Sequence, residues 1–171
     1  MNTRWKPSTT VAAIIEQDGK FLLVEEHTSE GLRLNNPAGH LDEGESLTQA
    51  CQRETLEETM HLFVPTVLLG VYMSRFARPA QATEAAQDVT YLRFAFYGRL
   101  GPLQVGRTLD TGIVRTLWLS ADEVRASADR HRSPLVLRCM EDYLAGQGFP
   151  LTLIHTDPSV HGHQLVRRGI A

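Results

Sequence analysis

The chain has 171 residues, 42% of them hydrophobic, and its 17 basic and 20 acidic side chains give a formal net charge of -3. This length can bury one sizeable core, so we expect a single domain over residues 1–171. The small acidic excess leaves no broad cationic surface for nucleic-acid phosphates, and no apolar run is long enough to cross a bilayer. We therefore expect neither nonspecific nucleic-acid binding nor membrane insertion.

Cysteine content and the N-terminus both favour a cytoplasmic protein. Cys51 and Cys139 are too few for a disulfide framework and lack metal-ligand spacing, so we expect two free, packed thiols in a reducing compartment. The apolar run 11–15 is too short for a signal sequence and is ended by Glu16 and Asp18.

The first predicted elements form a hairpin. Apolar runs lie on either side of Asp18-Gly19, a dipeptide suited to the positive φ angles of a tight turn, so we predict paired strands over 9–16 and 20–26. Residues 28–45 are rich in Gly, Asn and Asp, which is typical of a structured loop with short strands.

A helix is predicted next, over residues 47–59. Ser46 followed by Gln49 is a capping-box pattern at its start. Helical spacing places four residues on one packed side: Leu47, Ala50, Cys51 and Thr55.

The rest of the chain alternates extended and helical segments. Runs rich in Val, Leu, Tyr, Phe or Thr predict strands over 64–76, 89–100 and 112–119, with a mobile polar loop at about 78–88. Ser120 is expected to cap a short helix, and Ser133-Pro134 to open another that ends at about Gly146. We expect a loose tail over about 156–171.

Three acidic residues of the first helix suggest chemistry. Side chains advance about 100° per residue, so Glu54, Glu57 and Glu58 share one helix face. Carboxylates this close resist ionisation unless a cation compensates them, and oxygen ligands favour Mg²⁺ or Mn²⁺. Taken alone, the helix fits an ordinary solvated acidic face equally well.

The spacing of glycine, arginine and glutamate residues over 39–58 decides between these interpretations. It resembles the Nudix box, G-x5-E-x7-R-E-x2-E-E, whose positions are occupied by Gly39, Glu45, Arg53, Glu54, Glu57 and Glu58. The resemblance implies an α/β fold, an α/β/α sandwich around a mixed β-sheet. It also implies hydrolysis of a nucleoside diphosphate linked to another moiety, or of a related pyrophosphate, with Mg²⁺ or Mn²⁺.

The same resemblance implies roles for individual residues. Glu54 and Glu58 correspond to the principal metal ligands, Glu57 to a ligand or to the base that deprotonates water, and the Gly39 carbonyl to a further ligand. The implied metal ligands are thus Gly39, Glu54, Glu57 and Glu58, and the implied catalytic residues are Glu57, Glu54, Arg53 and Glu45.

Arg53 and Glu45 are expected to orient these carboxylates, because the Arg53 side chain points back toward the helix N-terminus. The alternative is a surface ion pair of little energetic value. The chain departs from the box at Thr55, Met60 and His61. We expect Met60 to prolong the helix or to enter the following strand without a left-handed glycine cap.

Further segments resemble the bacterial Nudix phosphatases of the NudJ type: "TVAAIIEQDGKFLLVEE", "NNPAGHLDEGESL", "YLRFAFYGRL", "RSPLV" and "GFPL". This implies a cytoplasmic monomer that releases phosphate from nucleoside tri- and diphosphates and from thiamine or hydroxymethylpyrimidine pyrophosphate. Two alternatives are an ADP-ribose or other dinucleotide pyrophosphatase, and a non-catalytic Nudix ligand sensor. The complete acidic box and the absence of a DNA-binding domain oppose the sensor.

Outside the box, the substrate-binding candidates are Arg93, His40, Asp110 and Arg132. Arg93 faces away from the apolar side of its strand and could meet a phosphate, or it could be solvated. Asp110 could be a distal acidic group that binds metal or activates water, or a turn-forming residue. Aromatic candidates for stacking on a substrate ring, or for the core, are Tyr72, Tyr91 and Phe96.

Overall fold

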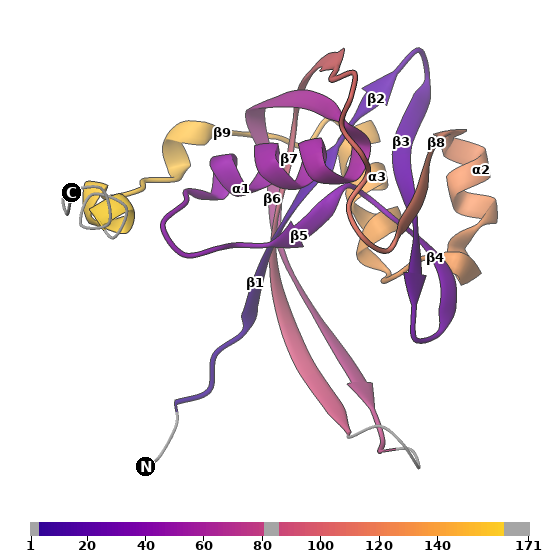
Figure 1. The fold of residues 1–171 in the computed structure, drawn as a ribbon, viewed down its shortest axis with the longest axis horizontal. Coiled ribbons are helices and arrows are strands. Elements are labelled where there is room, and N and C mark those ends of the chain that lie inside the picture. The colour runs from indigo at the N-terminus through magenta and orange to yellow at the C-terminus, as the bar shows by residue number, and fades with distance from the viewer. Residues whose placement is uncertain (1–3, 81–85, 163–171) are drawn as a thin grey trace.

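Two β-sheets and three α-helices make up the fold in the computed structural model, which describes residues 4–80 and 86–162 (Figure 1). No helix in these ranges is long and apolar enough to span a membrane. The strands are β1 (Ser8–Ile14), β2 (Glu16–Gln17), β3 (Lys20–Thr28), β4 (Gly31–Asn35), β5 (Ala38–His40), β6 (His61–Arg78), β7 (Gln87–Leu103), β8 (Ile113–Ser120) and β9 (Phe149–Pro150). The helices are α1 (Leu47–Thr59), α2 (Ala121–Ala126) and α3 (Leu135–Leu144).

The larger sheet is mixed, with strand order β5-β1-β7-β6-β9. Strand β1 runs parallel to β7 and antiparallel to β5, whereas β6 is antiparallel to β7. In this register, Thr10 lies opposite both Arg93 of β7 and His40 of β5. The arrangement brings residues from distant parts of the sequence side by side.

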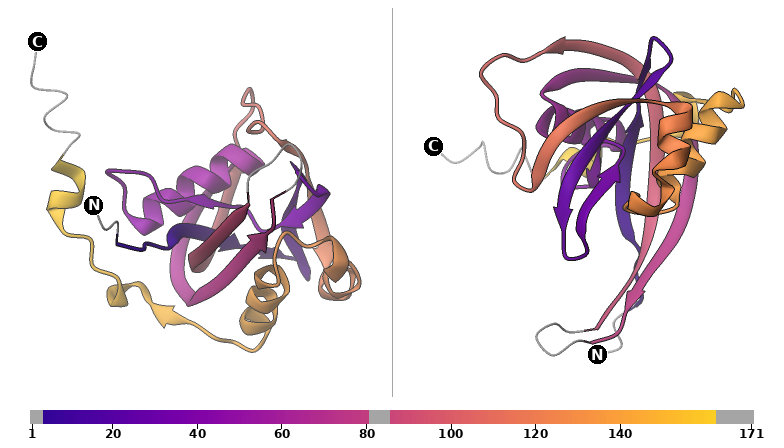
Figure 2. Two further views of the ribbon diagram at one scale, coloured as in Figure 1. Left: turned by 90° about the horizontal axis from the view of Figure 1, so that it is seen from below. Right: turned by 90° about the vertical axis from the view of Figure 1, so that its right-hand side faces the viewer.

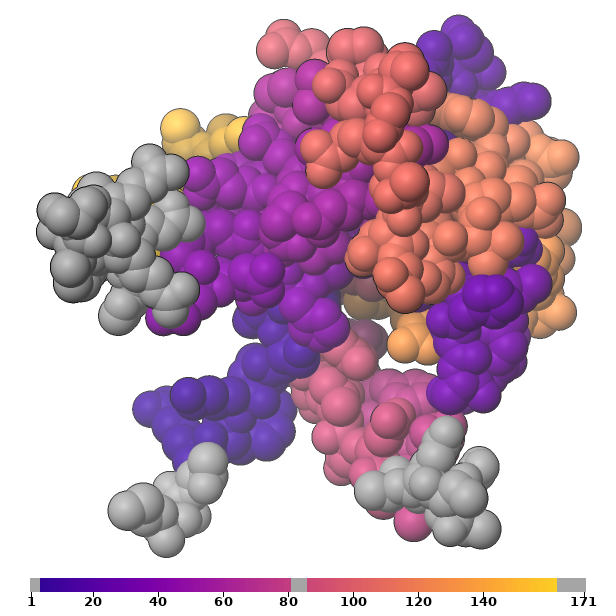
Figure 3. Space-filling view, in the orientation of Figure 1, coloured from indigo at the N-terminus to yellow at the C-terminus, as the bar shows by residue number. Residues whose placement is uncertain are grey.

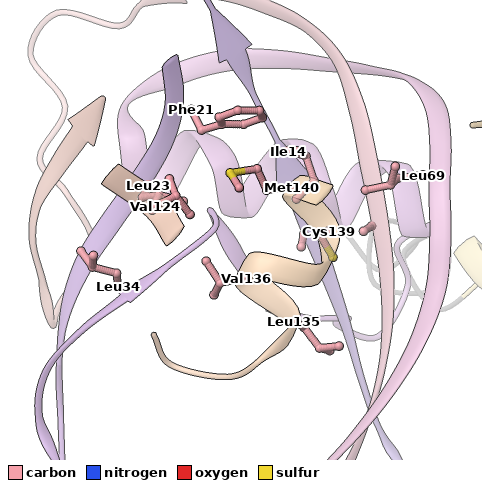
Figure 4. Packing of buried hydrophobic residues seen from close by; sticks show 12 residues of the cluster. Ile14, Phe21, Leu23, Leu34, Leu69, Val124, Leu135, Val136, Cys139 and Met140 are labelled. Carbon is pink, nitrogen blue, oxygen red and sulfur yellow. The ribbon is translucent and has the colours of Figure 1, made fainter. Parts of the chain in front are cut away.

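Helices cover both faces of this sheet (Figure 2). Val11 and Ala13 pack in the core that includes Ala50 and Cys51 of α1. Ala12 and Ile14 of β1 pack in a second core with three residues of α3: Val136, Cys139 and Met140 (Figure 4). A strand buried on both faces is continuously apolar, which explains the run from Val11 to Ile15. The expected α/β/α sandwich is confirmed, and both cysteines are free and buried.

The predicted first hairpin is only partly right. Asp18 and Gly19 do form its turn, with φ angles of 53° and 76°. Only the two residues of β2 pair with β3, however, because the chain changes sheets at Ile15. Strand β1 thereby enters the larger sheet, where both of its apolar faces are covered, and β3 pairs instead with β4 and β8.

Helix α1 has the predicted bounds and the predicted capping box. Ser46 Oγ accepts from the Gln49 N–H, and Gln49 Oε1 accepts from the Ser46 N–H. The expectation for Met60 was wrong, because Met60 itself is left-handed, with φ 60° and ψ 7°. Its N–H donates to the Leu56 carbonyl at 2.9 Å, and its carbonyl accepts from the Gln104 N–H at 2.7 Å. These two bonds hold a conformation that glycine usually provides.

The later helices agree with the sequence, but the loop boundaries do not. Ser120 caps α2 with a capping box, and α3 lies within the expected range. The strands β6 and β7 form a long hairpin whose pairing continues to Arg78 and Gln87, within the loop expected at 78–88 (Figure 1). Of that loop, residues 81–85 lie outside the described residues.

The first part of the segment expected to be a loose tail contains regular structure. A 3-10 helix forms over Pro158–His161, and His161 Nδ1 lies 2.9 Å from the Gly44 carbonyl oxygen. Residues 163–171 lie outside the described residues.

Candidate active site

A cleft of about 750 Å³ opens beside the acidic face of α1, between the β6–β7 hairpin and the turn that joins β3 to β4 (Figure 3). The N-terminal end of α3 forms a further wall. The charged and ring-bearing residues that line the cleft include Glu26, His40, Arg53, Glu54, Glu57, Glu58, Tyr91, Arg93, Asp110 and Arg132.

Arg53 is the centre of an ion-pair network at the mouth of the cleft. Its Nε and Nη2 donate to the two carboxylate oxygens of Glu45, at 3.1 and 2.7 Å. Its Nη1 donates to Glu54 at 2.7 Å and to Glu57 at 3.1 Å, and Nη2 also donates to the His40 carbonyl at 2.9 Å. One planar guanidinium thus fixes three carboxylates, which agrees with the orienting role expected for the pair of Arg53 and Glu45.

Among the three acidic residues on this face of α1, Glu54, Glu57 and Glu58, the most deeply buried is Glu58, with 8% of the residue exposed. Its Oε2 accepts from the Ala38 N–H at 2.8 Å. Burial raises its pKa to about 8; the Ala38 bond opposes this rise, and the nearby carboxylates of Glu54, Glu26 and Asp110 increase it. The protonated form is therefore favoured until a positive charge arrives beside it.

Glu54 is held between Arg53 and β5. Burial raises its pKa, although the hydrogen bond from Arg53 opposes the rise. A Cβ atom at Gly39 would lie 2.1 Å from the Glu54 carboxyl carbon, well inside van der Waals contact. Only a glycine at position 39 leaves room for the Glu54 carboxylate in its present place.

The acidic residues fit a hard divalent cation in their donor chemistry. In residues 4–80 and 86–162, no three His, Cys, Asp or Glu side chains are grouped closely enough to form a ready metal site. Arg53 instead compensates the charge of Glu54 and Glu57. Oxygen donors from Glu54, Glu57 and Glu58 match the preference of Mg²⁺ or Mn²⁺. A cation bound beside Glu58 would lower its raised pKa.

Asp110 lies beside the C-terminal part of α1. Its N–H donates to the Glu57 carbonyl at 2.9 Å, which ties the loop before β8 to the acidic helix. Its Oδ1 accepts from the Thr111 N–H at 2.7 Å, so the turn-forming role is also present. The structure therefore brings Asp110 into the cleft without removing the simpler explanation.

His40 and Arg132 both line the cleft, His40 from β5 and Arg132 from the segment before α3. The exposed His40 ring lies 6.3 Å from the Tyr91 ring, centroid to centroid, at an angle of 52°. Arg132 Nε is 3.9 Å from a Glu26 carboxylate oxygen. Of the other aromatic candidates, Phe96 is fully buried in the core, and Tyr72 donates its hydroxyl hydrogen to Asp142 at 3.0 Å outside this cleft.

Arg93 is buried rather than solvated, with 8% of the residue exposed, and it lines the cleft. Its Nε and Nη1 have no hydrogen-bond partner among the described residues. Burial lowers its pKa, while Cys139, Glu26 and Glu58 act in the opposite direction. This unusual environment leaves its donors available to a ligand.

Glu26 is a cleft residue that the sequence did not reveal. Its Oε1 accepts from Asn35 Nδ2 at 3.2 Å, so β3 and β4 contribute one wall together. Its neighbour Glu25 points the other way and is paired with Arg115 and Arg130. No local pattern separates these two glutamates, because only the pairing of β3 determines which one faces the cleft.

Comparisons with known proteins agree with this architecture. The family model described as NUDIX domain matches residues 5–139. The "Phosphatase NudJ" of Escherichia coli strain K12 is 35% identical over 150 residues, which cover 88% of this chain and 92% of that protein. The same protein of Shigella flexneri matches to the same extent.

Solved structures give the same result. A "NUDIX hydrolase from Nitrosomonas europaea" is 50% identical, has a TM-score of 0.78 and is matched over 98% of its length, with 89% of this chain covered. A "MutT NUDIX hydrolase from Burkholderia pseudomallei" has a TM-score of 0.60 at 18% identity, with 81% of this chain and 98% of that chain covered, and supports the fold alone. By its sequence and its fold, this chain belongs to the Nudix hydrolase family.

Proposed function

We propose that this chain is a divalent-cation-dependent phosphatase of the NudJ type, acting as a cytoplasmic monomer. Its substrates are nucleoside tri- and diphosphates and thiamine or hydroxymethylpyrimidine pyrophosphate, from which it releases inorganic phosphate. The main support is one cleft that combines the acidic face of α1 with Arg93, whose Nε and Nη1 have no hydrogen-bond partner among the described residues. The similarity to Phosphatase NudJ over 92% of that protein supports the phosphatase activity.

In this proposal, Glu54, Glu57, Glu58 and the Gly39 carbonyl hold Mg²⁺ or Mn²⁺. The bound cation would neutralise charge on the phosphate oxygens and would favour deprotonation of a water molecule. Arg53 and Glu45 keep the carboxylates in position through the network described above. His40, Arg93, Asp110 and Arg132 bind the substrate.

Glu57 is assigned as the base. Its side chain is 36% exposed, whereas that of Glu54 is 13% exposed, so Glu57 is the more accessible to water. A water oxygen attacks phosphorus, Glu57 takes a proton from that water, and the bond from phosphorus to the bridging oxygen breaks. The products are orthophosphate and the shortened phosphate ester.

The test is phosphate release by the pure enzyme with Mg²⁺ from thiamine pyrophosphate, nucleoside triphosphates and ADP-ribose. Each reaction is run with and without added pyrophosphatase or phosphomonoesterase. Direct release from the first two substrates supports the proposal. Signal that appears only after a helper enzyme acts means internal cleavage and supports the dinucleotide pyrophosphatase.

Glu57→Gln tests the assigned base. We expect turnover to fall by about two to four orders of magnitude, the range for loss of general base catalysis, while the melting temperature stays close to that of the parent. Glu141→Gln is the matched control, because Glu141 lies on α3 and pairs with Arg125 outside the cleft. Full turnover in Glu57→Gln would remove Glu57 from the mechanism.

A further inference from the structure

Arg93 is a buried cation whose partners are missing from the described part of the chain. Its Nε and Nη1 are both buried and unbonded. A native protein rarely leaves a buried charged donor unsatisfied, because the cost of removing it from water is not recovered. Such a group calls for a ligand or an ordered water molecule.

The nearest carboxylates are engaged elsewhere. Glu26 accepts a hydrogen bond from Asn35, and Glu58 accepts one from the Ala38 N–H. Both influence Arg93 electrostatically, yet neither forms an ion pair with it. The donors of Arg93 therefore remain free to bind an anion from the cleft.

Thr10 provides a second unsatisfied group beside Arg93. The two residues are paired in the parallel ladder of β1 and β7, so their side chains lie on the same face of the sheet. Thr10 Oγ1 is buried, has no hydrogen-bond partner in the described residues, and belongs to a residue that lines the cleft. A planar guanidinium and an adjacent hydroxyl match the oxygen atoms of a tetrahedral oxyanion.

We propose that Arg93 and Thr10 form a buried subsite for the terminal phosphoryl group of the substrate, and for the orthophosphate that is released from it. This inference rests on the proposed function and adds a direction to it. Both residues are buried, and their strands β1 and β7 each have a neighbouring strand on both sides, so a substrate cannot continue past them. Only the end of a substrate reaches such a position, and the anhydride next to that end is the one cleaved.

The proposal also specifies the fate of each atom. Water adds its oxygen to the terminal phosphorus and gives up one proton to the base. The bond between that phosphorus and the bridging oxygen breaks, and the bridging oxygen leaves with the rest of the substrate. Orthophosphate is left on Arg93 and Thr10.

The first experiment measures binding of inorganic phosphate to the full chain in EDTA, by calorimetry and by thermal shift. No metal and no turnover are involved, so the result is independent of catalysis. We expect phosphate to bind and to raise the melting temperature of the wild type. In Arg93→Met the affinity should fall about tenfold to a hundredfold, as expected when hydrogen bonds to a charged group are lost.

Two variants separate binding from a structural role. Without phosphate, Arg93→Met should melt at or above the wild-type temperature, because an unpaired buried charge has been replaced by an apolar chain. The matched control is Arg99→Met, an exposed arginine further along β7 and outside the cleft, which should bind phosphate like the wild type. If Arg93→Met does not fold, Thr10→Val preserves the side-chain shape and should weaken phosphate binding roughly threefold to tenfold.

Equal phosphate affinity in the wild type and Arg93→Met would overturn the proposal, as would the absence of phosphate binding to the wild type. A capped substrate supplies the second arm, in which turnover of a nucleoside diphosphate is compared with that of its terminal methyl ester. The wild type should strongly prefer the uncapped form, and Arg93→Met should lose this preference. Phosphate binding without any hydrolysis would refute the proposed function alone, whereas hydrolysis without phosphate binding would refute the subsite alone.

Discussion

Glu58→Gln should stabilise the metal-free protein, by an amount that grows with pH. In the folded chain the pKa of Glu58 is about 8, above its ordinary value of 4.5, because the carboxyl group is buried. Below pH 4.5 the group is protonated in both the folded and the unfolded chain, and the two proteins should have similar stability. As pH rises through this window, only the unfolded chain releases the proton, so wild-type stability falls.

The size of the effect follows from that window. At about 1.36 kcal/mol for each pKa unit, the penalty is about 3 kcal/mol at pH 7 and about 5 kcal/mol once pH exceeds the folded pKa of about 8. Glutamine removes the titrating group while its side-chain oxygen still accepts from the Ala38 N–H, the bond that Glu58 makes at 2.8 Å. The variant should therefore gain up to these amounts.

Urea unfolding in EDTA at pH 5, 7 and 9 measures the difference. Glu141→Gln is the control, and it should lower the stability instead of raising it, because Arg125 lowers the pKa of that exposed carboxylate. A Glu58→Gln curve that runs parallel to the wild type from pH 5 to 9 would refute the reasoning, since burial would then carry no ionisation cost. Mg²⁺ should stabilise the wild type and have much less effect on the variant.

Three further predictions concern the geometry around α1. Gly39→Ala should reduce Mg²⁺-dependent turnover at least about tenfold, because the new methyl group displaces the Glu54 carboxylate. The backbone is not displaced, so the helical signal in circular dichroism should change little. Unchanged turnover would show that Glu54 works from another position. Arg53→Lys should lower turnover by about tenfold to a hundredfold in the same assay. An ammonium group cannot bind both Glu45 oxygens, as the planar guanidinium does, while also binding Glu54. Full activity would show that only the positive charge at position 53 is needed. Met60→Gly should raise the free energy of unfolding, measured with urea, by about 1 kcal/mol, because glycine adopts the left-handed conformation of position 60 without strain. A loss of stability would show that the Met60 side chain contributes more than the backbone strain costs.

The parts of the fold governed by local chemistry were predictable from the sequence. Ser46 and Gln49 fix the start of α1 through bonds within one turn, so its first residue followed directly. The Asp18-Gly19 turn was predictable for the same reason, since it depends on two φ angles. The partner of β1 was not predictable, because alternation along one strand does not specify which other strand lies beside it.

The candidate site divides along the same line. The acidic positions of α1 and their Arg53 partner have a fixed spacing in one helix, and in the structure Arg53 donates hydrogen bonds to Glu54 and Glu57. Glu26 enters the cleft only through the pairing of β3 with β4. The burial of Arg93 depends on strands on both sides of β7, so its own neighbours in the sequence could not distinguish a buried from a solvated arginine.

The position of β1 also has a consequence for how the chain folds during synthesis. Its parallel partner β7 begins only at Gln87, so the apolar run from Val11 to Ile14 emerges from the ribosome long before the strand that must cover its other edge. Closing so long a loop is entropically slow, and contacts between distant residues delay folding. Until then this apolar segment lacks the strand that pairs with that edge, and unpaired apolar segments are prone to aggregation. We therefore expect the nascent chain to be most vulnerable before β1 meets β7.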